Sequence, residues 1–329
     1  MSRLLWVNER KLNEHGTSIK GMTPLNDFNA VARGYYSFVP RFSKEPNIWG
    51  LDNENYILDT ITETVNFTNI TDSRMQDILE VSYKENLPIL IHWSGGIDST
   101  VILSAFLKHC DKPEQKVEIL MGDSSIIENT VFYEKFIKNK FNIVKGEDYN
   151  LETMLDKYIH VTGQPADQLF HNQRTVDVLS NHSILSQNII NNAKSFGITL
   201  NTAYDLSWWA HFNYTWNDIR FLDIAEYGYN LSTNTLINHQ TNHIKWFDTI
   251  DYQRWGFNRN REYDINPTLT KMEFKDYIYN FDYNSSYRDN MVKKSSSKKQ
   301  PIKSNILGIT SDYCAITGLE EFYSSLPSA

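Results

Sequence analysis

Cysteine is scarce in this sequence, which has only Cys110 and Cys314 among its 329 residues. The two lie far apart and form no Cys-x-x-Cys pattern, so neither a disulfide framework nor a thiolate zinc site is expected. Long apolar runs are missing as well. No stretch approaches the roughly 18 residues of a membrane-spanning helix, and the first residues lack the apolar core of a signal peptide. We therefore expect a cytoplasmic protein with no membrane segment.

An excess of basic residues is also missing, because 32 Lys and Arg stand against 40 Asp and Glu, a formal charge of −8. This balance argues against broad affinity for nucleic acids or membranes, although it leaves a local basic groove possible. The chain is rich in aromatic residues, with 8 Trp, 19 Tyr and 17 Phe, and 40% of it is hydrophobic. That content is sufficient for a sizeable core in one large domain or two smaller ones.

Three parts are expected along the chain. Residues 1–85 hold short aromatic or alternating pieces separated by Pro, Gly and Asn, which are typical of loops and short strands. Residues 86–210 are expected to form an α/β core. Residues 211–329 are expected to be a mainly helical region that closes over the site, and the Ser- and Lys-rich stretch 293–300 is expected to be a surface loop.

Apolar segments alternate with helical patterns in and around the predicted core. Such alternation predicts βαβ units, and hence a parallel sheet flanked by helices. The strands are predicted at 87–93, 116–123 and 141–148. The helices are predicted at 71–86, from Ile97 onward, at 129–140, at 151–163 with a turn, and at 183–197, where Gly197 is a plausible C-cap.

The segment Ser94-Gly95-Gly96-Ile97-Asp98-Ser99 lies between a predicted buried strand and a predicted helix. Two glycines allow a tight turn and a close approach of the backbone to a ligand. The turn amides and the free N–H groups of the first helical turn can hold an anion, with the hydroxyls of Ser94, Ser99 and Thr100 as further donors. Asp98 would repel a bare phosphate but suits a Mg²⁺ ion bridging carboxylate and phosphate. The motif therefore predicts phosphate binding. The alternative is a plain strand-to-helix turn capped by Asp98.

SGGIDS resembles the SGGxDS signature of the PP-loop ATP pyrophosphatases, among them asparagine synthetase, GMP synthetase and NAD synthetase, in which the loop grips the leaving pyrophosphate. The segment TGQPADQLF (162–170) resembles a second motif, found in the asparagine synthetase C-terminal domain. The resemblance implies a five-stranded parallel sheet. It also implies ATP and Mg²⁺ as cofactors, Asp98 and Asp167 as metal ligands, and Gly163 beside the nucleotide. The adenine is expected near Met121 to Asp123, and Asp167 as a plain helix cap is the alternative.

The resemblance also implies a lysine that neutralises charge on the phosphates, for which Lys271 is the first choice and Lys275 the reserve. The alternative is that both are surface lysines on a helix. Two departures from the family pattern matter. Gln164 and Gln168 stand where the family has acidic residues, and a glutamine cannot act as a base at neutral pH. This makes ammonia-dependent asparagine synthesis doubtful. The segment before the loop is too short for the glutaminase domain of full-length asparagine synthetase. The stretch 247–258 resembles one in short asparagine synthetase-like proteins, many of them encoded by tailed phages.

The function expected from these motifs is an ATP-dependent synthetase that adenylates a carboxylate or amide oxygen of a small-molecule substrate. Free ammonia or an amine would then displace AMP. One alternative is a PP-loop enzyme that modifies a nucleobase or tRNA, and another is a nucleotide-binding module without turnover. His239 and His243, four residues apart, could share a helix face as metal ligands, but no acidic or cysteine partner stands at matching spacing.

Overall fold

The computed structural model describes residues 65–149, 157–171, 173–180, 183–215, 242–261 and 269–291, together with Met154 and six further strands. Those strands are β1 (Arg3–Asn8), β2 (Tyr35–Ser37), β7 (Tyr229–Asn230), β8 (Thr235–Leu236), β10 (Ser304–Ile309) and β11 (Ile316–Gly318). The chain divides into two compact units. The first comprises Met1–Ile57, His171–Asn234 and Lys299–Ala329, and the second comprises Leu58–Phe170 and Thr235–Lys298.

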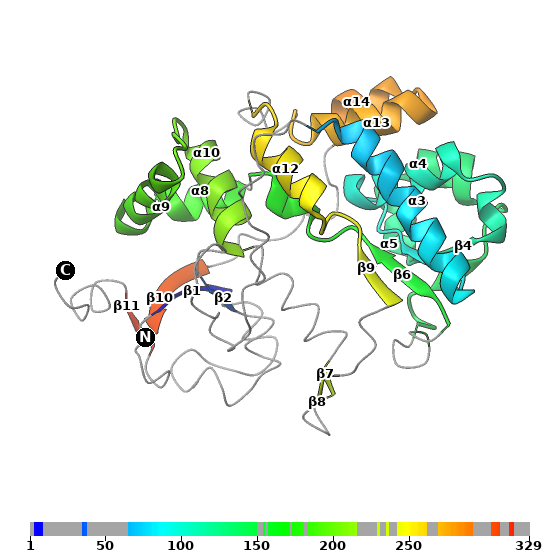
Figure 1. Ribbon diagram of the computed structural model, residues 1–329, viewed down its shortest axis with the longest axis horizontal. Helices are drawn as coiled ribbons and strands as arrows, with labels where there is room; N and C mark the ends of the chain where they lie inside the picture. Colours follow the sequence, from blue (N-terminus) through cyan, green and yellow to red (C-terminus); the bar gives the residue numbers. More distant parts are fainter. Residues whose placement is uncertain are drawn as a thin grey trace. The chain divides into compact units, whose positions relative to one another are not determined.

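A five-stranded, all-parallel sheet forms the centre of the second unit, and it confirms the predicted α/β class (Figure 1). Its order is β5-β4-β3-β6-β9. The register pairs Ile91 of the central strand with Ile119 on one side and Val161 on the other. The strands are β3 (Ile89–His92), β4 (Val117–Met121), β5 (Ile143–Lys145), β6 (Ile159–Thr162) and β9 (His243–Lys245).

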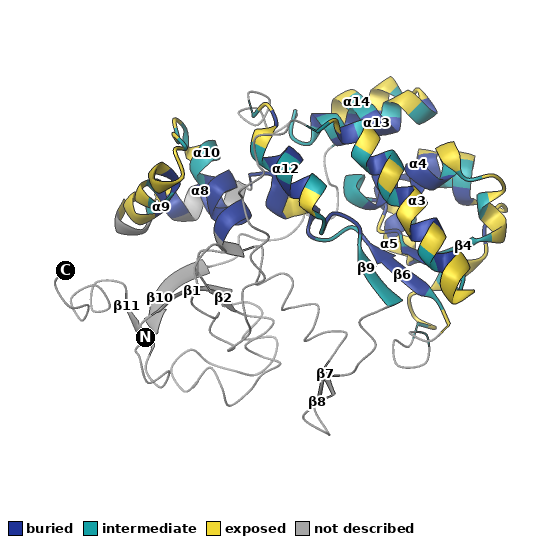
Figure 2. Cartoon of the chain, in the orientation of Figure 1, coloured by how far each residue is buried: buried dark blue, intermediate teal, exposed yellow. Residues whose placement is uncertain are grey.

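Helices flank this sheet and complete its core. Helix α4 (Ile97–His109) is buried without interruption from Ser99 to Phe106, as expected for a helix covered on all sides, and it contacts α3 (Phe67–Glu85) and α13 (Met272–Asp282). Helix α3 is amphipathic, with one buried and one exposed side (Figure 2). Helices α12 (Ile250–Asn258) and α14 (Ser285–Asn290) belong to the same unit.

Two strands of the sheet, β6 and β9, were not predicted from the sequence. Residues 151–163 were expected to be a helix and a turn, but Ile159–Thr162 form β6, with all four residues buried. The β-branched residues Ile159, Val161 and Thr162 favour this extended segment, which is paired on both sides. His243 lies in β9, and a strand does not place residues four apart as a helix face would. The helix that His239 and His243 could have shared is therefore not present at His243, and His239 lies outside the described residues.

Smaller differences concern helix ends. Helix α3 begins at Phe67, four residues before the predicted start, and Asn66 caps it by accepting a hydrogen bond from the amide of Asn69. The helix predicted at 129–140 is observed as α6 (Thr130–Phe132) followed by a π-helical turn (Tyr133–Ile137), after a separate α5 (Asp123–Glu128). The helix predicted at 183–197 is confirmed as α9 (Ser183–Ser195), and Gly197 follows it with φ +73°.

The first unit contains an antiparallel sheet of order β11-β10-β1-β2, in which β1 near the start of the sequence pairs with β10 near its end. Its helices are α8 (Gln173–Ser180), α9, α10 (Ala203–Trp209) and the π-helical segment η6 (Ala210–Thr215). Trp208, Trp209 and Phe212 are fully buried among these helices, so the tryptophan pair belongs to a core.

The two units do not follow the expected limits at residues 86 and 210. Helix α3 precedes residue 86 yet packs on α4, and β9 follows residue 210 yet pairs with β6. Both segments complete the second unit. The C-terminal part, 211–329, contains strands β7 to β11 as well as α12 to α14, and segment 293–300 lies outside the described residues. None of the helices in the described part of the chain combines the length and the apolar character that crossing a bilayer requires.

Candidate functional site

The strand order reverses at β3. Strands β4 and β5 follow β3 in the chain and lie on one side of it, whereas β6 and β9 lie on the other. At such a switch point the connections leave the carboxyl ends of neighbouring strands in opposite directions, which opens a crevice where open parallel sheets bind ligands. The loop after β3 carries Ser94 to Gly96, and the loop after β6 carries Gly163 to Asp167. Two motifs that are distant in the sequence therefore lie at the same edge of the sheet.

Gly95 permits the tight turn between β3 and α4. Its φ is +76°, in the left-handed region, and a Cβ atom at this position would lie 2.3 Å from the carbonyl oxygen of Ser125 and 2.8 Å from the Cβ of Glu128. Both neighbours belong to α5, which follows β4. The loop therefore packs directly against α5, and only glycine fits at residue 95 without displacing backbone.

Hydroxyl groups hold the loop in shape from inside. The Ser99 hydroxyl accepts a hydrogen bond from the Ser94 amide at 3.1 Å and donates one to the Gly96 carbonyl at 3.2 Å. The Thr100 hydroxyl donates to the same carbonyl at 2.8 Å and accepts from the Trp93 indole at 3.2 Å. Ser99 and Thr100 are buried, whereas Ser94 is exposed. Of the three hydroxyls expected to face an anion, only that of Ser94 reaches the surface, while those of Ser99 and Thr100 stabilise the turn.

The other two predicted loop positions begin α4. Gly96 is the N-cap, with no side-chain hydrogen bond to the helix, and Ile97 is the first helical residue. The amides of a first helical turn have no intrahelical acceptor, and the helix dipole is positive at this end. Asp98 is the acidic residue of that turn.

Gly163 brings the second motif against the first. A Cβ atom at Gly163 would lie 3.2 Å from the Cβ of Asp98 and 3.5 Å from the amide nitrogen of Ser99. The loop after β6 thus passes in direct contact with the first turn of α4. It continues into a short 3₁₀ helix, η5 (Ala166–Leu169), with Asp167 in its first turn.

Lys271 joins the two motifs. Its ammonium nitrogen lies 2.7 and 2.8 Å from the two carboxylate oxygens of Asp98 and 2.6 Å from Oδ1 of Asp167. Lys271 precedes α13 and has φ +61°. A left-handed conformation costs a residue other than glycine about 1–3 kcal/mol, so the surrounding structure holds this lysine in place. The three residues predicted to carry the chemistry, separated by up to 173 positions, are joined through the Lys271 ammonium.

The electrostatics keep the Lys271 ammonium charged. Burial alone would lower the pKa of Lys271, but attraction and hydrogen bonds from Asp167 and Asp98 outweigh it and raise the pKa above its ordinary value. The reserve candidate, Lys275, lies one turn further along α13 and is 1% exposed. Burial lowers the pKa of Lys275, opposed by the charge of Asp289. Lys271, the first choice of the two lysines, is therefore charged and in contact with both carboxylates.

The donor set fits a magnesium ion that is shared with phosphate. Mg²⁺ commonly uses one or two carboxylates and completes its shell with phosphate oxygens and water. Asp98 and Asp167 already share one cation, the Lys271 ammonium. The Thr162 hydroxyl and the Gln164 amide oxygen, on either side of Gly163, are buried and have no hydrogen-bond partner among the residues that the structure describes. Within that same part of the chain, no group of three or more His, Cys, Asp or Glu side chains could hold a metal by itself.

A histidine cluster that was not predicted lies on one face of the same sheet. His92 Nε2 lies 3.2 Å from His160 Nδ1, and the ring of His243 is 6.3 and 6.5 Å from those two rings. Burial is the main cause that lowers all three pKa values, to about 3 for His92 and His243. Because β6 and β9 were not predicted as strands, no sequence pattern indicated that these three histidines would meet.

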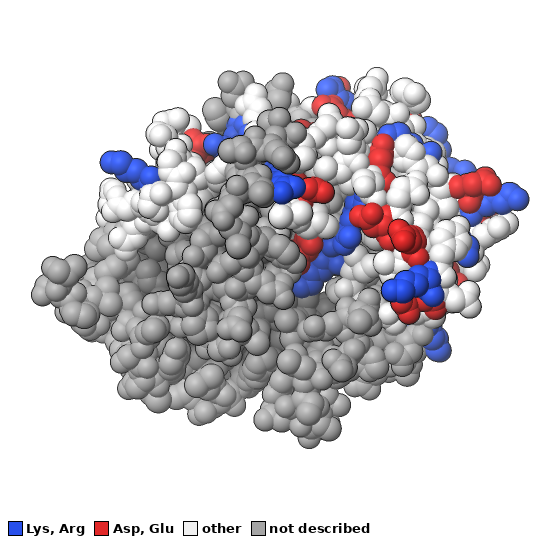
Figure 3. Space-filling view, viewed as in Figure 1, with Lys and Arg blue, Asp and Glu red and all other residues white. Residues whose placement is uncertain are grey.

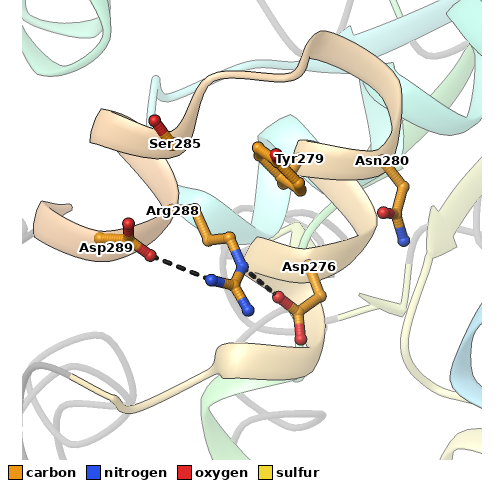
Figure 4. Close-up of a pocket in the computed structure, with 6 residues that line it drawn as sticks. All are labelled: Asp276, Tyr279, Asn280, Ser285, Arg288 and Asp289. Carbon is orange, nitrogen blue, oxygen red and sulfur yellow. Dashed lines mark hydrogen bonds and ion pairs between the residues drawn. The ribbon is translucent and has the colours of Figure 1, made fainter.

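A surface pocket of about 590 Å³ lies between α13 and α14 and contains none of the predicted site residues (Figure 4). Arg288 crosses it, with Nε 2.5 Å from Asp276 and Nη1 3.1 Å from Asp289. The remaining lining residues are Tyr279, Asn280 and Ser285. The cation in this pocket is thus already neutralised by two carboxylates.

Comparison of the chain with family models, with curated proteins and with solved structures gives no match.

Proposed function

We propose that this chain binds ATP with Mg²⁺ at the loop Ser94–Gly96 and activates an oxygen of a small-molecule substrate by adenylation, releasing pyrophosphate. The observation that carries the proposal is the convergence of Asp98, Asp167 and Lys271 beside a glycine turn at the switch point of the sheet. A cation-binding pair of carboxylates, a charged lysine and an anion-binding helix end are the groups that polyphosphate chemistry requires.

The loop and the start of α4 supply the binding of phosphate. Gly95 permits the tight turn, and Gly96 begins α4 as an N-cap without a side chain of its own. The Ser94 hydroxyl is exposed and lies 3.2 Å from the Ser99 hydroxyl, and it would have to turn from that partner to donate to a phosphate. These donors are preorganised by the Ser99 and Thr100 hydrogen bonds, so little reorganisation is needed when charge develops on a leaving pyrophosphate.

Asp98 and Asp167 would hold Mg²⁺, which when bound neutralises phosphate oxygens and makes pyrophosphate a better leaving group. Lys271 pairs with both carboxylates. With Mg²⁺ held by Asp98 and Asp167, its ammonium would be able to donate to phosphate oxygens instead. While Asp167 and Asp98 hold the Lys271 ammonium they raise its pKa, so the group is protonated there, and beside phosphate oxygens it would act by its charge.

Gln164 and Gln168 concern the second step of the proposed reaction, in which a nitrogen nucleophile displaces AMP. Neither can remove a proton from an attacking amine at neutral pH. The nucleophile therefore has to arrive as a neutral amine or as free ammonia. The acceptor is an acid or amide small enough to reach the switch-point crevice.

The alternative of a nucleic-acid substrate calls for a basic groove along which phosphates could lie. On the face in Figure 3, many Lys and Arg side chains of the described residues lie beside Asp or Glu, and one group of basic side chains lies near the centre of the view. The experiment below distinguishes an enzyme from a nucleotide-binding module without turnover.

The test combines ATP binding with product analysis. We expect the wild-type protein to bind ATP·Mg²⁺ and to form AMP and pyrophosphate with one member of a panel of acids and amides supplied with ammonia. Asp98→Asn and Asp167→Asn keep the side-chain shape but remove the charge, and each should lower turnover by about 100-fold or more. Asp251→Asn, an exposed aspartate on α12, is the matched control. ATP binding without AMP across the panel would instead support the module.

A further inference from the structure

Arg259 is a buried cation at the end of α12. Its side chain is only 1% exposed, and its amide caps the helix by donating to the Trp255 carbonyl at 2.8 Å. Burying a guanidinium is unfavourable unless its charge and its donors are used. The contacts made by Arg259 therefore indicate why an arginine is present.

Those contacts go to the two segments that carry Asp167 and Lys271. Nε of Arg259 donates to the carbonyl of Leu169 at 3.1 Å, two residues after Asp167. Nη1 lies 3.8 Å from Oε1 of Glu273, two residues after Lys271. One planar side chain thus links the end of η5 to the first turn of α13.

The ring of Phe170 is a second link between the same segments. The guanidinium carbon of Arg259 lies 4.4 Å from the centre of this ring, and the ammonium of Lys271 lies 5.5 Å from it. Phe170 also packs edge-on against Phe274 of α13, with ring centres 5.0 Å apart. Both cations therefore contact the aromatic residue that directly follows η5.

From these contacts we infer that Arg259 is a positioning residue that sets the distance between Asp167 and Lys271, an inference that rests on the proposed function for its catalytic consequence. Arginine suits this task because its donors lie in one plane while its face stacks on an aromatic ring. A lysine can supply the charge but not both contacts at once. Small displacements of catalytic groups cost large factors in rate, so this link matters for turnover more than for binding ATP.

The test uses Arg259→Gln and Arg259→Lys, with Arg254→Gln as the matched control on the same helix. Arg254 pairs with Asp251 at 3.3 Å. One readout does not depend on activity: the rate at which acetic anhydride, an amine-reactive reagent, acetylates Lys271. Mass spectrometry measures this rate relative to that of the exposed Lys138 in the same sample. We expect Lys271 to be protected in the wild type, because two carboxylates hold its ammonium.

We expect Arg259→Gln to raise the modification rate of Lys271 by about tenfold, because the link that positions Lys271 against Asp167 is lost. Arg259→Lys should give an intermediate rate, and Arg254→Gln should keep the wild-type rate. If Arg259→Gln does not fold, Arg259→Lys decides between the same two outcomes. A wild-type modification rate in a folded Arg259 variant would overturn the inference, since a merely structural role would lower stability without exposing Lys271.

The activity arm separates this inference from the proposed function. If AMP is formed, Arg259→Gln should lower kcat by about tenfold with KM for ATP little changed, and Arg259→Lys should restore part of kcat. A rise in KM with unchanged kcat would contradict positioning. If the wild type forms no AMP, the proposed function fails, and the reactivity of Lys271 still decides the role of Arg259.

Discussion

Lys271 makes three short contacts to carboxylate oxygens of Asp98 and Asp167, and it does so from a left-handed backbone conformation. The Lys271 ammonium is thus the counter-charge of both carboxylates. In the proposed function these carboxylates would hold Mg²⁺, and Lys271 would then compete with the metal for them.

Lys271→Met tests this competition at the residue level. The variant leaves two carboxylates without the ammonium between them, so the ligand-free protein should bind Mn²⁺, a spectroscopic substitute for Mg²⁺, more tightly than the wild type does. Turnover should fall by about 100-fold or more, because the charge that stabilises the leaving pyrophosphate is gone. Electron paramagnetic resonance titration of Mn²⁺ measures the first effect. Lys138→Met, at an exposed ion pair, is the control, and equal Mn²⁺ affinity in all three proteins would contradict the competition.

Gly95 gives the second prediction at this scale. In Gly95→Ala the new methyl group would meet the Ser125 carbonyl oxygen in a conformation with positive φ. We expect the free energy of unfolding in urea to fall by more than about 2 kcal/mol, and ATP binding to weaken as the loop shifts. Gly122→Ala is the matched control, because a Cβ at Gly122 has no atom within 4 Å and its φ is −118°. Equal stability of the two variants would rule out the tight packing of the loop.

At the scale of elements, the sequence predicted what local patterns encode. Strands β3, β4 and β5, helices α4 and α9, and the glycine turn were all predicted from apolar runs, helical periodicity and turn residues. Strands β6 and β9 were not, because a four-residue and a three-residue strand carry too little pattern to outweigh a neighbouring helical periodicity.

In the candidate site, too, local patterns predicted individual residues but not the contacts between distant segments. The motifs and the family resemblance suggested Asp98, Asp167 and Lys271, but their contact depends on the strand order, which no local pattern specifies. Arg259 and the histidine cluster act only through tertiary contacts between distant segments. The internal roles of Ser99 and Thr100 could not be foreseen either, because the sequence shows a hydroxyl but not the direction in which it points.

The histidines of β3, β6 and β9 predict how the sheet responds to acid. Their pKa values are lowered in the folded protein, so below about pH 6.5 the unfolded chain takes up protons that the folded chain does not. Stability is therefore full above that pH and is lost as the pH falls toward about 3. The loss is at most about 1.4 kcal/mol per pH unit for each histidine.

Urea unfolding at pH 7, 6 and 5 measures this slope. A double variant, His92→Gln with His243→Gln, should lose stability less steeply than the wild type between pH 6 and 5. The same slope in both proteins would mean that these two imidazoles titrate normally in the folded state.

At the scale of the molecule, the second unit is built from two stretches of chain, Leu58–Phe170 and Thr235–Lys298. The first supplies the loop, Asp98 and Asp167, and the second supplies β9, Arg259 and Lys271. The 64 residues that separate the two stretches belong to the other unit. The site is therefore complete only when both stretches have folded together, and its chemistry is a property of the whole unit.

The stoichiometry of products from ATP tests the central claim most directly. With the acceptor found in the panel, the wild-type protein should form AMP and pyrophosphate in equal amounts and no ADP, and Asp98→Asn should form neither. Formation of ADP and phosphate would contradict the account, because it would mean attack at the terminal phosphate and not at the α-phosphorus.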